Sequence, residues 1–247
     1  MNIWMGAAVL GVSGLVIGAS FEWWTRRWLQ KVSDEIQASG VGGEGGHRIT
    51  GLVAGGTAAL FLIVGWRYGW SGETLVGAVL AAFLLPLALI DLKTMLLPDA
   101  LTLTLLGMMF ALRGWLGPEP WVWYVIGGGL GAGMLLLLAW LSPILFGKEG
   151  MGLGDVKLMA AIGMATGLDG AILTLFFASL AGIVFGLVYR RFRLGQPNNV
   201  SGSTTGTAAN ADLDDDAFPF GPALALGGFL AFLFGDDVWR AYWSLLV

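Results

Sequence analysis

Long apolar runs separated by short polar stretches make up most of this 247-residue chain. About 20 apolar residues are enough for a helix to cross the hydrocarbon core of a bilayer. The runs predict eight membrane helices, the sixth of them short for a full crossing, at residues 3–21, 51–66, 74–90, 101–115, 121–146, 156–167, 171–189 and 218–234. The expected fold is all-α, a single integral membrane domain over residues 1–247 with about eight transmembrane helices.

Two polar connections between these runs are longer than the others. Residues 22–48 end in a glycine-rich stretch with no capacity to pack as a domain. Residues 194–217 are rich in Gly, Ser, Thr and Asn and close with an acidic run at 212–216. An acidic run of this kind is typical of a solvated loop rather than a ligand site. We therefore predict flexible loops at 22–48 and 194–217.

The distribution of basic residues predicts the orientation in the membrane. With eight crossings, ten of the thirteen fall on one side: Arg26, Arg27, Lys31, Arg48, Lys93, Lys148, Lys157, Arg190, Arg191 and Arg193. Only Arg67, Arg113 and Arg240 fall on the other side. Because cytoplasmic loops of membrane proteins carry the excess of Lys and Arg, the first side is expected to be cytoplasmic. Both predicted loops then lie in the cytoplasm, and both termini lie outside it.

Composition narrows the possible chemistry. The chain is 56% hydrophobic and 12% charged, with a mean hydropathy of +0.76, which excludes an ordinary soluble domain. Its net charge of −4 is no signal for nucleic acid. The absence of cysteine excludes disulfides, thiolate metal sites and a cysteine nucleophile, and the single histidine, His47, leaves no histidine cluster. Carboxylates are the remaining candidates for catalysis.

The first candidate is Asp155, in Gly152-Leu153-Gly154-Asp155-Val156-Lys157 between two apolar runs. An ionisable residue inside a membrane span costs about 2.5–3.5 kcal/mol on insertion scales, which makes it a functional candidate. The flanking glycines allow backbone or a substrate to come close. The structural alternative is a helix start, with Asp155 as N-cap and Lys157 reaching toward lipid head groups.

The second candidate is Asp91, which directly follows the third apolar run and precedes Lys93. Pro98 disfavours helix at the residue before it and suits the first turn of a new helix, so residues 91–98 are expected to form a tight turn. Asp99 then faces the positive end of the next helix, which favours a structural role. Asp91 gains nothing from a dipole at a helix C-terminus, so its carboxylate needs another explanation.

Asp91 and Asp155 are both predicted at the cytoplasmic ends of their helices. Two carboxylates about 3 Å apart cannot both ionise, so such a pair shares one proton. One carboxylate then acts as general base toward water, and the other donates a proton to a carbonyl oxygen. The sequence therefore predicts aspartic hydrolase chemistry at one membrane face.

Four motifs together resemble a known family, the type IV prepilin peptidases, which are aspartic proteases of the bacterial inner membrane. Two motifs hold the family's aspartates, and the other two close the first helix and open the last. The matching residues are Asp91, Lys93, Leu97, Pro98 and Asp99; Gly152, Gly154, Asp155 and Lys157; Gly18, Ala19, Ser20 and Phe21; and Pro219, Phe220, Gly221 and Pro222. The motifs occur in the family's order and with the expected topology, from the first helix to the last.

The resemblance implies an aspartic endopeptidase that removes the leader from prepilins or pseudopilins at the cytoplasmic face, after a glycine that precedes the substrate's hydrophobic helix. Carried over by position, Asp91 and Asp155 are its catalytic pair. Supporting or substrate-binding roles fall to Lys93, Lys157, Gly152, Gly154, Pro98, Asp99, Phe220, Gly221 and Pro222. The implied partners are prepilin or pseudopilin substrates and the lipid bilayer, without nucleic acid.

The chain departs from many members of this family at residues 22–48. Those members carry a cytoplasmic insert there with two Cys-x-x-Cys pairs that bind zinc, and they also methylate the new pilin N-terminus from S-adenosylmethionine. This chain has no cysteine, so zinc at such an insert is excluded. The departure argues against methylation, and His47 is expected to be an ordinary loop residue. The peptidase step itself is expected to need no cofactor.

Two alternatives remain open from the residues. Presenilin-like intramembrane proteases also use Gly-x-Gly-Asp, and Pro222-Ala223-Leu224 is similar to their Pro-Ala-Leu element. Their other aspartate follows a tyrosine within a helix, whereas Asp91 follows Ile90. A secondary transporter would use intramembrane carboxylates to carry protons or cations, but no inverted repeat is visible. The peptidase is the favoured interpretation.

Overall fold

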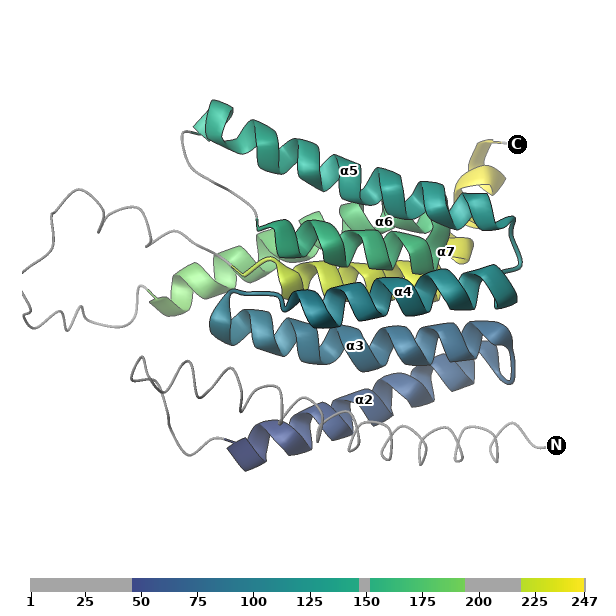
Figure 1. Ribbon diagram of the computed structural model, residues 1–247, viewed down its shortest axis with the longest axis horizontal. Coiled ribbons are helices and arrows are strands. Elements are labelled where there is room, and N and C mark those ends of the chain that lie inside the picture. The colour runs from purple at the N-terminus through teal and green to yellow at the C-terminus, as the bar shows by residue number, and fades with distance from the viewer. Residues whose placement is uncertain (1–45, 147–151, 194–218, 247) are drawn as a thin grey trace, which may run out of the picture. The chain divides into compact units, whose positions relative to one another are not determined.

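The computed structural model describes residues 46–146, 152–193 and 219–246. The predicted helix at 3–21 and the predicted loop at 194–217 lie outside these ranges. The described residues form helices α2 (Gly46–Tyr68), α3 (Gly72–Thr94), α4 (Asp99–Leu116), α5 (Trp121–Phe146), α6 (Leu153–Arg193) and α7 (Gly221–Leu246) (Figure 1). The all-α prediction is confirmed for this part of the chain. Five of these helices, α3 to α7, are long and apolar enough to cross a membrane, and the total of eight stays a prediction.

Several predicted helix boundaries are wrong. α2 begins at Gly46, so the end of the predicted 22–48 loop is helical. α3 continues past residue 90 to Thr94, because the Met95 N–H donates a hydrogen bond to the Asp91 carbonyl at 2.8 Å. Met95, at φ 52°, then closes the helix in the left-handed conformation, a capping position that glycine usually occupies.

α7 continues past residue 234 to Leu246. Its C-terminal part contains Asp237 and Arg240, which form an ion pair at 2.7 Å one turn apart. Charged residues end an apolar run but do not end a hydrogen-bonded helix. The apolar run therefore predicted an end for this helix that was too early.

α6 is two helical stretches that meet at Gly167. Its backbone angles, φ 74° and ψ −172°, lie in a region that is essentially restricted to glycine. The break lies at the boundary predicted between the sixth and seventh apolar runs. The prediction of two segments here is confirmed by the break, although the two stretches follow each other without a loop.

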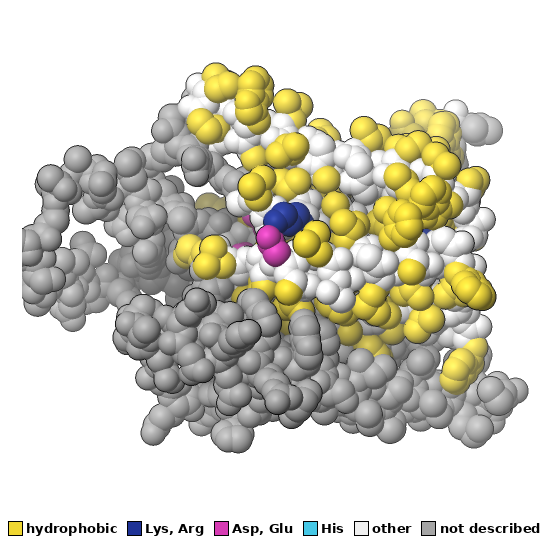
Figure 2. Space-filling model, in the orientation of Figure 1, with side chains coloured by type: hydrophobic (Ala, Val, Ile, Leu, Met, Phe, Trp, Pro, Cys, Tyr) yellow, Lys and Arg dark blue, Asp and Glu magenta, His cyan; other side chains and the backbone are white. Residues whose placement is uncertain are grey.

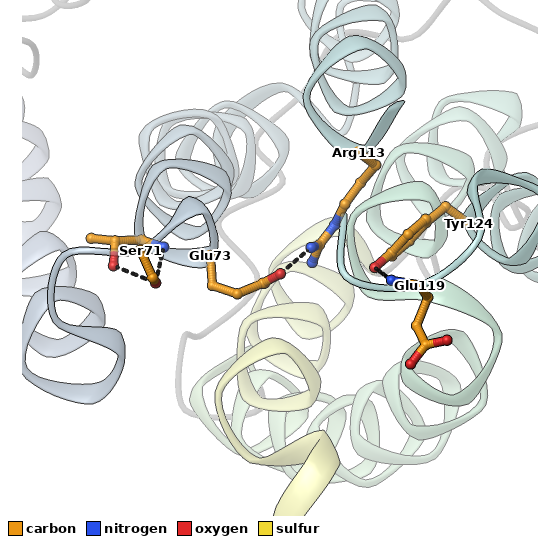
Figure 3. A network of polar contacts seen from close by, with 6 residues as sticks. Ser71, Glu73, Arg113, Glu119 and Tyr124 are labelled. Carbon is orange, nitrogen blue, oxygen red and sulfur yellow. Dashed lines mark hydrogen bonds and ion pairs between the residues drawn. The ribbon is translucent and has the colours of Figure 1, made fainter. Parts of the chain in front are cut away.

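The described residues fall into two compact units. The first consists of residues 46–86 and 112–118. In it, Gly69, at φ 61°, ends α2, and Ser71 begins α3 by accepting a hydrogen bond from the Thr74 N–H. These contacts confirm the turn predicted between the two helices. Glu73 in the first turn of α3 forms an ion pair with Arg113 in the last turn of α4 (Figure 3).

The second unit consists of residues 87–111 and the described residues from 119 onward, and in it α6 packs against both α5 and α7. Glycines allow the close approach. A Cβ at Gly163 of α6 would lie 2.8 Å from the Gly127 carbonyl carbon of α5, and a Cβ at Gly227 of α7 would lie 2.5 Å from the Ala178 amide nitrogen. Small residues replace hydrophobic burial as the means of packing helices in lipid, because lipid tails are as apolar as leucine.

Many large apolar side chains are exposed on the outer surface of the described helices. Figure 2 shows hydrophobic side chains spread over the described part of the face that it draws. On α5 the exposed ones include Leu130, Met134, Leu136, Leu137, Leu138 and Trp140. A continuous apolar exterior on membrane-length helices is stable against lipid chains and not against water. The chain is a multi-pass membrane protein.

Replacing Gly163 by alanine should lower the free energy of unfolding by about 1–3 kcal/mol, because the new methyl group would overlap the backbone of α5. Thermal unfolding in detergent measures the change. Gly129→Ala on α5 is the matched control, since its Cβ would meet no atom within 4 Å. Equal thermal stability of the two variants would contradict the proposed helix contact.

Candidate active site

Asp91 lies in the last turn of α3 and is 5% exposed. Its Oδ2 accepts a hydrogen bond from the N–H of Gly221 at 2.8 Å. Gly221 is the first residue of α7, where the N–H groups have no partner within the helix and carry partial positive charge. The start of α7 therefore both orients the Asp91 carboxylate and stabilises negative charge on it.

Only glycine fits at position 221. A Cβ there would lie 2.6 Å from Oδ2 and 2.8 Å from Cγ of Asp91. Pro222 is buried in the first turn of α7, a position where proline loses no hydrogen bond. The ring of Phe220 lies beside Gly182 of α6, at 3.2 Å from where a Cβ would stand. Thus the predicted motif residues Phe220, Gly221 and Pro222 set the start of α7, and Gly221 contacts Asp91.

Asp155 is the third residue of α6 and is 8% exposed. Its N–H donates to the Gly152 carbonyl at 3.2 Å, so Gly152 rather than Asp155 is the residue that precedes the helix. Within the described residues, Asp155 Oδ1 is buried and has no hydrogen-bond partner. A buried polar atom without a partner is costly unless a ligand, water or substrate completes it.

The fold brings Asp91 and Asp155 together from two helices that are far apart in the sequence. Leu97, six residues after Asp91, packs on Gly154, the residue that directly precedes Asp155. The C-terminal end of α3 and the N-terminal ends of α4, α6 and α7 all lie at the same end of the second unit (Figure 1). This end of the unit therefore holds two buried carboxylates.

The turn between α3 and α4 packs directly on the start of α6. A Cβ at Gly154 would lie 2.7 Å from the Cβ of Leu97, whereas a Cβ at Gly152 would meet nothing closer than 3.9 Å. Pro98 is buried and its carbonyl accepts from the Leu101 N–H, which begins α4. Of the two motif glycines, Gly154 is thus the one that close packing requires.

Lys157 pairs with Asp99 instead of with either buried aspartate. Its Nζ lies 2.6 Å from Asp99 Oδ1, and both side chains are partly exposed. Asp99 also lies in the first turn of α4, where a negative charge is favourable, as predicted. The side chain of Lys93, the other predicted lysine, lies outside the described part of the chain.

Two contacts of this site have no signal in the sequence taken position by position. The Gly221–Asp91 hydrogen bond joins two motifs whose spatial relation the sequence does not state. The packing of Leu97 on Gly154 is likewise visible only in the fold. The sequence does contain a signal for the packing of α5 on α6. Gly127 and Gly131 on α5, and Gly163 and Gly167 on α6, have the four-residue spacing that is typical of closely packed membrane helices.

Chemically, the arrangement suits general acid–base catalysis. Two neighbouring carboxylates in a site of low dielectric can hold one proton between them and activate one water molecule. Among the described residues, no group of three or more His, Cys, Asp or Glu side chains is arranged to hold a metal ion.

Comparison with known proteins agrees with this chemistry. The Type IV leader peptidase family matches residues 78–187, a range that contains both aspartates. A prepilin leader peptidase/N-methyltransferase of Neisseria gonorrhoeae is 39% identical over 187 residues, which are 75% of this chain and 57% of that relative.

Proteins of the same name from Pseudomonas putida and Aeromonas salmonicida are 38% and 37% identical, over 79% and 77% of this chain and 62% and 60% of the relatives. The chain spans about three fifths of the length of these curated relatives. No solved structure matches the chain.

The contrast between the two motif glycines is directly testable. Gly154→Ala should lower the free energy of unfolding by about 1–3 kcal/mol, since its methyl group meets a side-chain atom fixed to the backbone of Leu97. Gly152→Ala, two residues away, should change it by no more than about 0.5 kcal/mol. Thermal unfolding of both variants in the same detergent measures the two changes. A larger loss of stability for Gly152→Ala than for Gly154→Ala would refute the packing of Gly154 on Leu97.

Proposed function

Because residues 78–187 of this chain match the type IV leader peptidase family, we propose that the chain is a member of this family and an aspartic endopeptidase that removes the N-terminal leader from prepilins or pseudopilins. The observation that carries the proposal is the presence of two buried carboxylates, those of Asp91 and Asp155, at one end of the second unit. The relatives' name gives the substrate class. Asp91 and Asp155 are the proposed catalytic residues.

Hydrolysis by this pair follows from its chemistry. One carboxylate takes a proton from water, whose oxygen attacks the carbonyl carbon of the scissile peptide, while the other gives its proton to the carbonyl oxygen. When the tetrahedral intermediate collapses, the C–N bond breaks and the proton taken from water passes to the leaving amine. The proton belongs to the coupled pair rather than to a fixed residue, so the pair is the catalytic unit.

The protein environment supports each carboxylate differently. The Gly221 N–H fixes the orientation of Asp91 and stabilises its charge. Asp155 Oδ1 is buried and has no partner within the described residues, so its hydrogen-bonding capacity is left for a water molecule or the substrate carbonyl. One carboxylate is thus held by a hydrogen bond and the other has an oxygen without a partner within the described residues. This difference fits the two roles in peptide hydrolysis, general base toward water and proton donor to the carbonyl oxygen.

The proposed site faces the cytoplasm at the inner membrane. The excess of basic residues predicts this orientation for the end of the chain that carries Asp91 and Asp155. A prepilin leader, polar and followed by a hydrophobic helix, would reach this end from the cytoplasm while its helix lies in the bilayer. Leu96 and Leu153, both largely exposed, lie on the segments that flank the aspartates and offer apolar surface to that helix.

The proposal ends at hydrolysis. The relatives' name also includes an N-methyltransferase, whereas this chain carries no cysteine for a zinc-binding insert. Use of S-adenosylmethionine depends on whether methylation is retained, and the missing zinc-binding cysteines argue against that step.

Asp91→Asn and Asp155→Asn should each lower the rate of leader removal by about 10²–10⁴-fold, because an amide can neither accept nor supply the catalytic proton. The measurement is the mass of a prepilin after incubation with the purified protein and an S-adenosylmethionine donor. The product is expected to lack the leader and to gain no methyl group.

Asp236→Asn is the matched control, because Asp236 is exposed on the C-terminal part of α7. It should cleave at the wild-type rate. Wild-type protein that leaves several prepilins intact, or cleavage that persists in both aspartate variants, would exclude the proposed peptidase.

Gly221→Ala should reduce the rate of leader removal by about 10–100-fold, since its methyl group would displace either Asp91 or the start of α7. The same mass assay gives the rate. Gly186→Ala on α6, whose Cβ would meet nothing within 4 Å, should cleave normally. Full activity of Gly221→Ala would show that the hydrogen bond to Asp91 is dispensable.

A further inference from the structure

The ion pair between Asp99 and Lys157 joins the ends of two helices beside the proposed catalytic pair. Asp99 is the first residue of α4, and Lys157 lies in α6 two residues after Asp155. Their charged atoms are 2.6 Å apart, with the Lys157 side chain 35% exposed and the Asp99 side chain 61% exposed. The pair thus lies at the rim of the site and not among the buried carboxylates.

Residues 91–99, which join α3 to α4, make three contacts with α6 and α7. Asp91 accepts from Gly221 of α7, Leu97 packs on Gly154 of α6, and Asp99 pairs with Lys157 of α6. Between the first two points, Met95 takes a left-handed conformation that costs free energy for a residue with a side chain. A strained turn needs outside contacts to keep one conformation.

The two catalytic candidates are held in different ways. Asp91 has a hydrogen bond of its own that fixes its carboxylate. Asp155 Oδ1 has none within the described residues, so the position of this carboxylate depends on where the first turn of α6 is held. Two contacts hold the start of α6: the packing of Gly154 on Leu97 and the ion pair of Lys157 with Asp99.

We propose that Asp99 and Lys157 are positioning residues that set the distance between Asp155 and Asp91 by holding the first turn of α6 against the start of α4. The inference deepens the proposed function and depends on it. It differs from the two simpler roles for Lys157, namely contact with the leader and attraction to lipid head groups. Neither of those roles involves Asp99.

Kinetics of single and double variants test the proposal. Asp99→Asn and Lys157→Met should each lower kcat about fivefold, the upper range for an exposed ion pair, and leave KM within about twofold. The double variant should be no slower than either single variant, because the pair is already broken. Lys157→Arg and Asp99→Glu, which keep the charges, should recover most of the wild-type kcat.

Other results would overturn the proposal. A raised KM with unchanged kcat in Lys157→Met would assign the lysine to substrate binding. Losses that multiply in the double variant would show that Asp99 and Lys157 act independently. Wild-type activity in both single variants would show that the pair has no role in positioning.

A distance measurement separates this inference from the proposed function, because it needs no cleavage. The chain has no cysteine, so spin labels can be placed at Leu96→Cys and Leu153→Cys, two exposed positions on the α3–α4 turn and at the start of α6. Adding Asp99→Asn should broaden the distribution of distances between the labels. If Asp99→Asn leaves the distribution of label distances unchanged, the positioning role is refuted even if the protein cleaves prepilins. If the distribution broadens but the wild type cleaves no prepilin, only the proposed peptidase function is refuted.

Discussion

The hydrogen bond from the Gly221 N–H to Asp91 is the contact on which the arrangement of the site depends. It places the positive end of α7 against a carboxylate at the end of α3, and it requires a residue without a side chain. Because Gly228 of α7 packs against Ile162 in the first stretch of α6, the same contact relates Asp91 to the helical stretch that begins beside Asp155. One backbone amide therefore couples the placement of three helices.

Close packing between helices makes this coupling rigid. In lipid, burial of apolar surface provides little force between helices, so short backbone distances and polar contacts decide how they pack. Gly163 of α6 lies against the backbone of α5, and Gly227 of α7 lies against the backbone of α6 near Ala178. The first stretch of α6 is thus held by the backbone of α5 at Gly163 and by Gly228 of α7 at Ile162, and the position of Asp155 at its start depends on that packing.

The site combines rigidity with one incomplete carboxylate. Asp91 is buried and oriented, whereas Asp155 is buried with Oδ1 unpartnered within the described residues. An unsatisfied polar atom lowers the stability of the free protein and is compensated when a polar group of water or substrate arrives. Such a cost is expected at a catalytic site, and it explains why the surrounding turn is tied by packing at Leu97 and by the ion pair at Asp99.

The sequence by itself determined the all-α class, the membrane-length helices of the described part and the two aspartate motifs, because apolar runs and short motifs are local properties of the chain. Apolarity measures preference for lipid rather than hydrogen bonding, so it misplaced the ends of α3 and α7, where helix continues through Asp91 and Asp237. Only the tertiary structure decided that Gly221 holds Asp91 and that Lys157 pairs with Asp99. Each of these contacts joins residues far apart in the sequence, and their distance is set by how the helices pack.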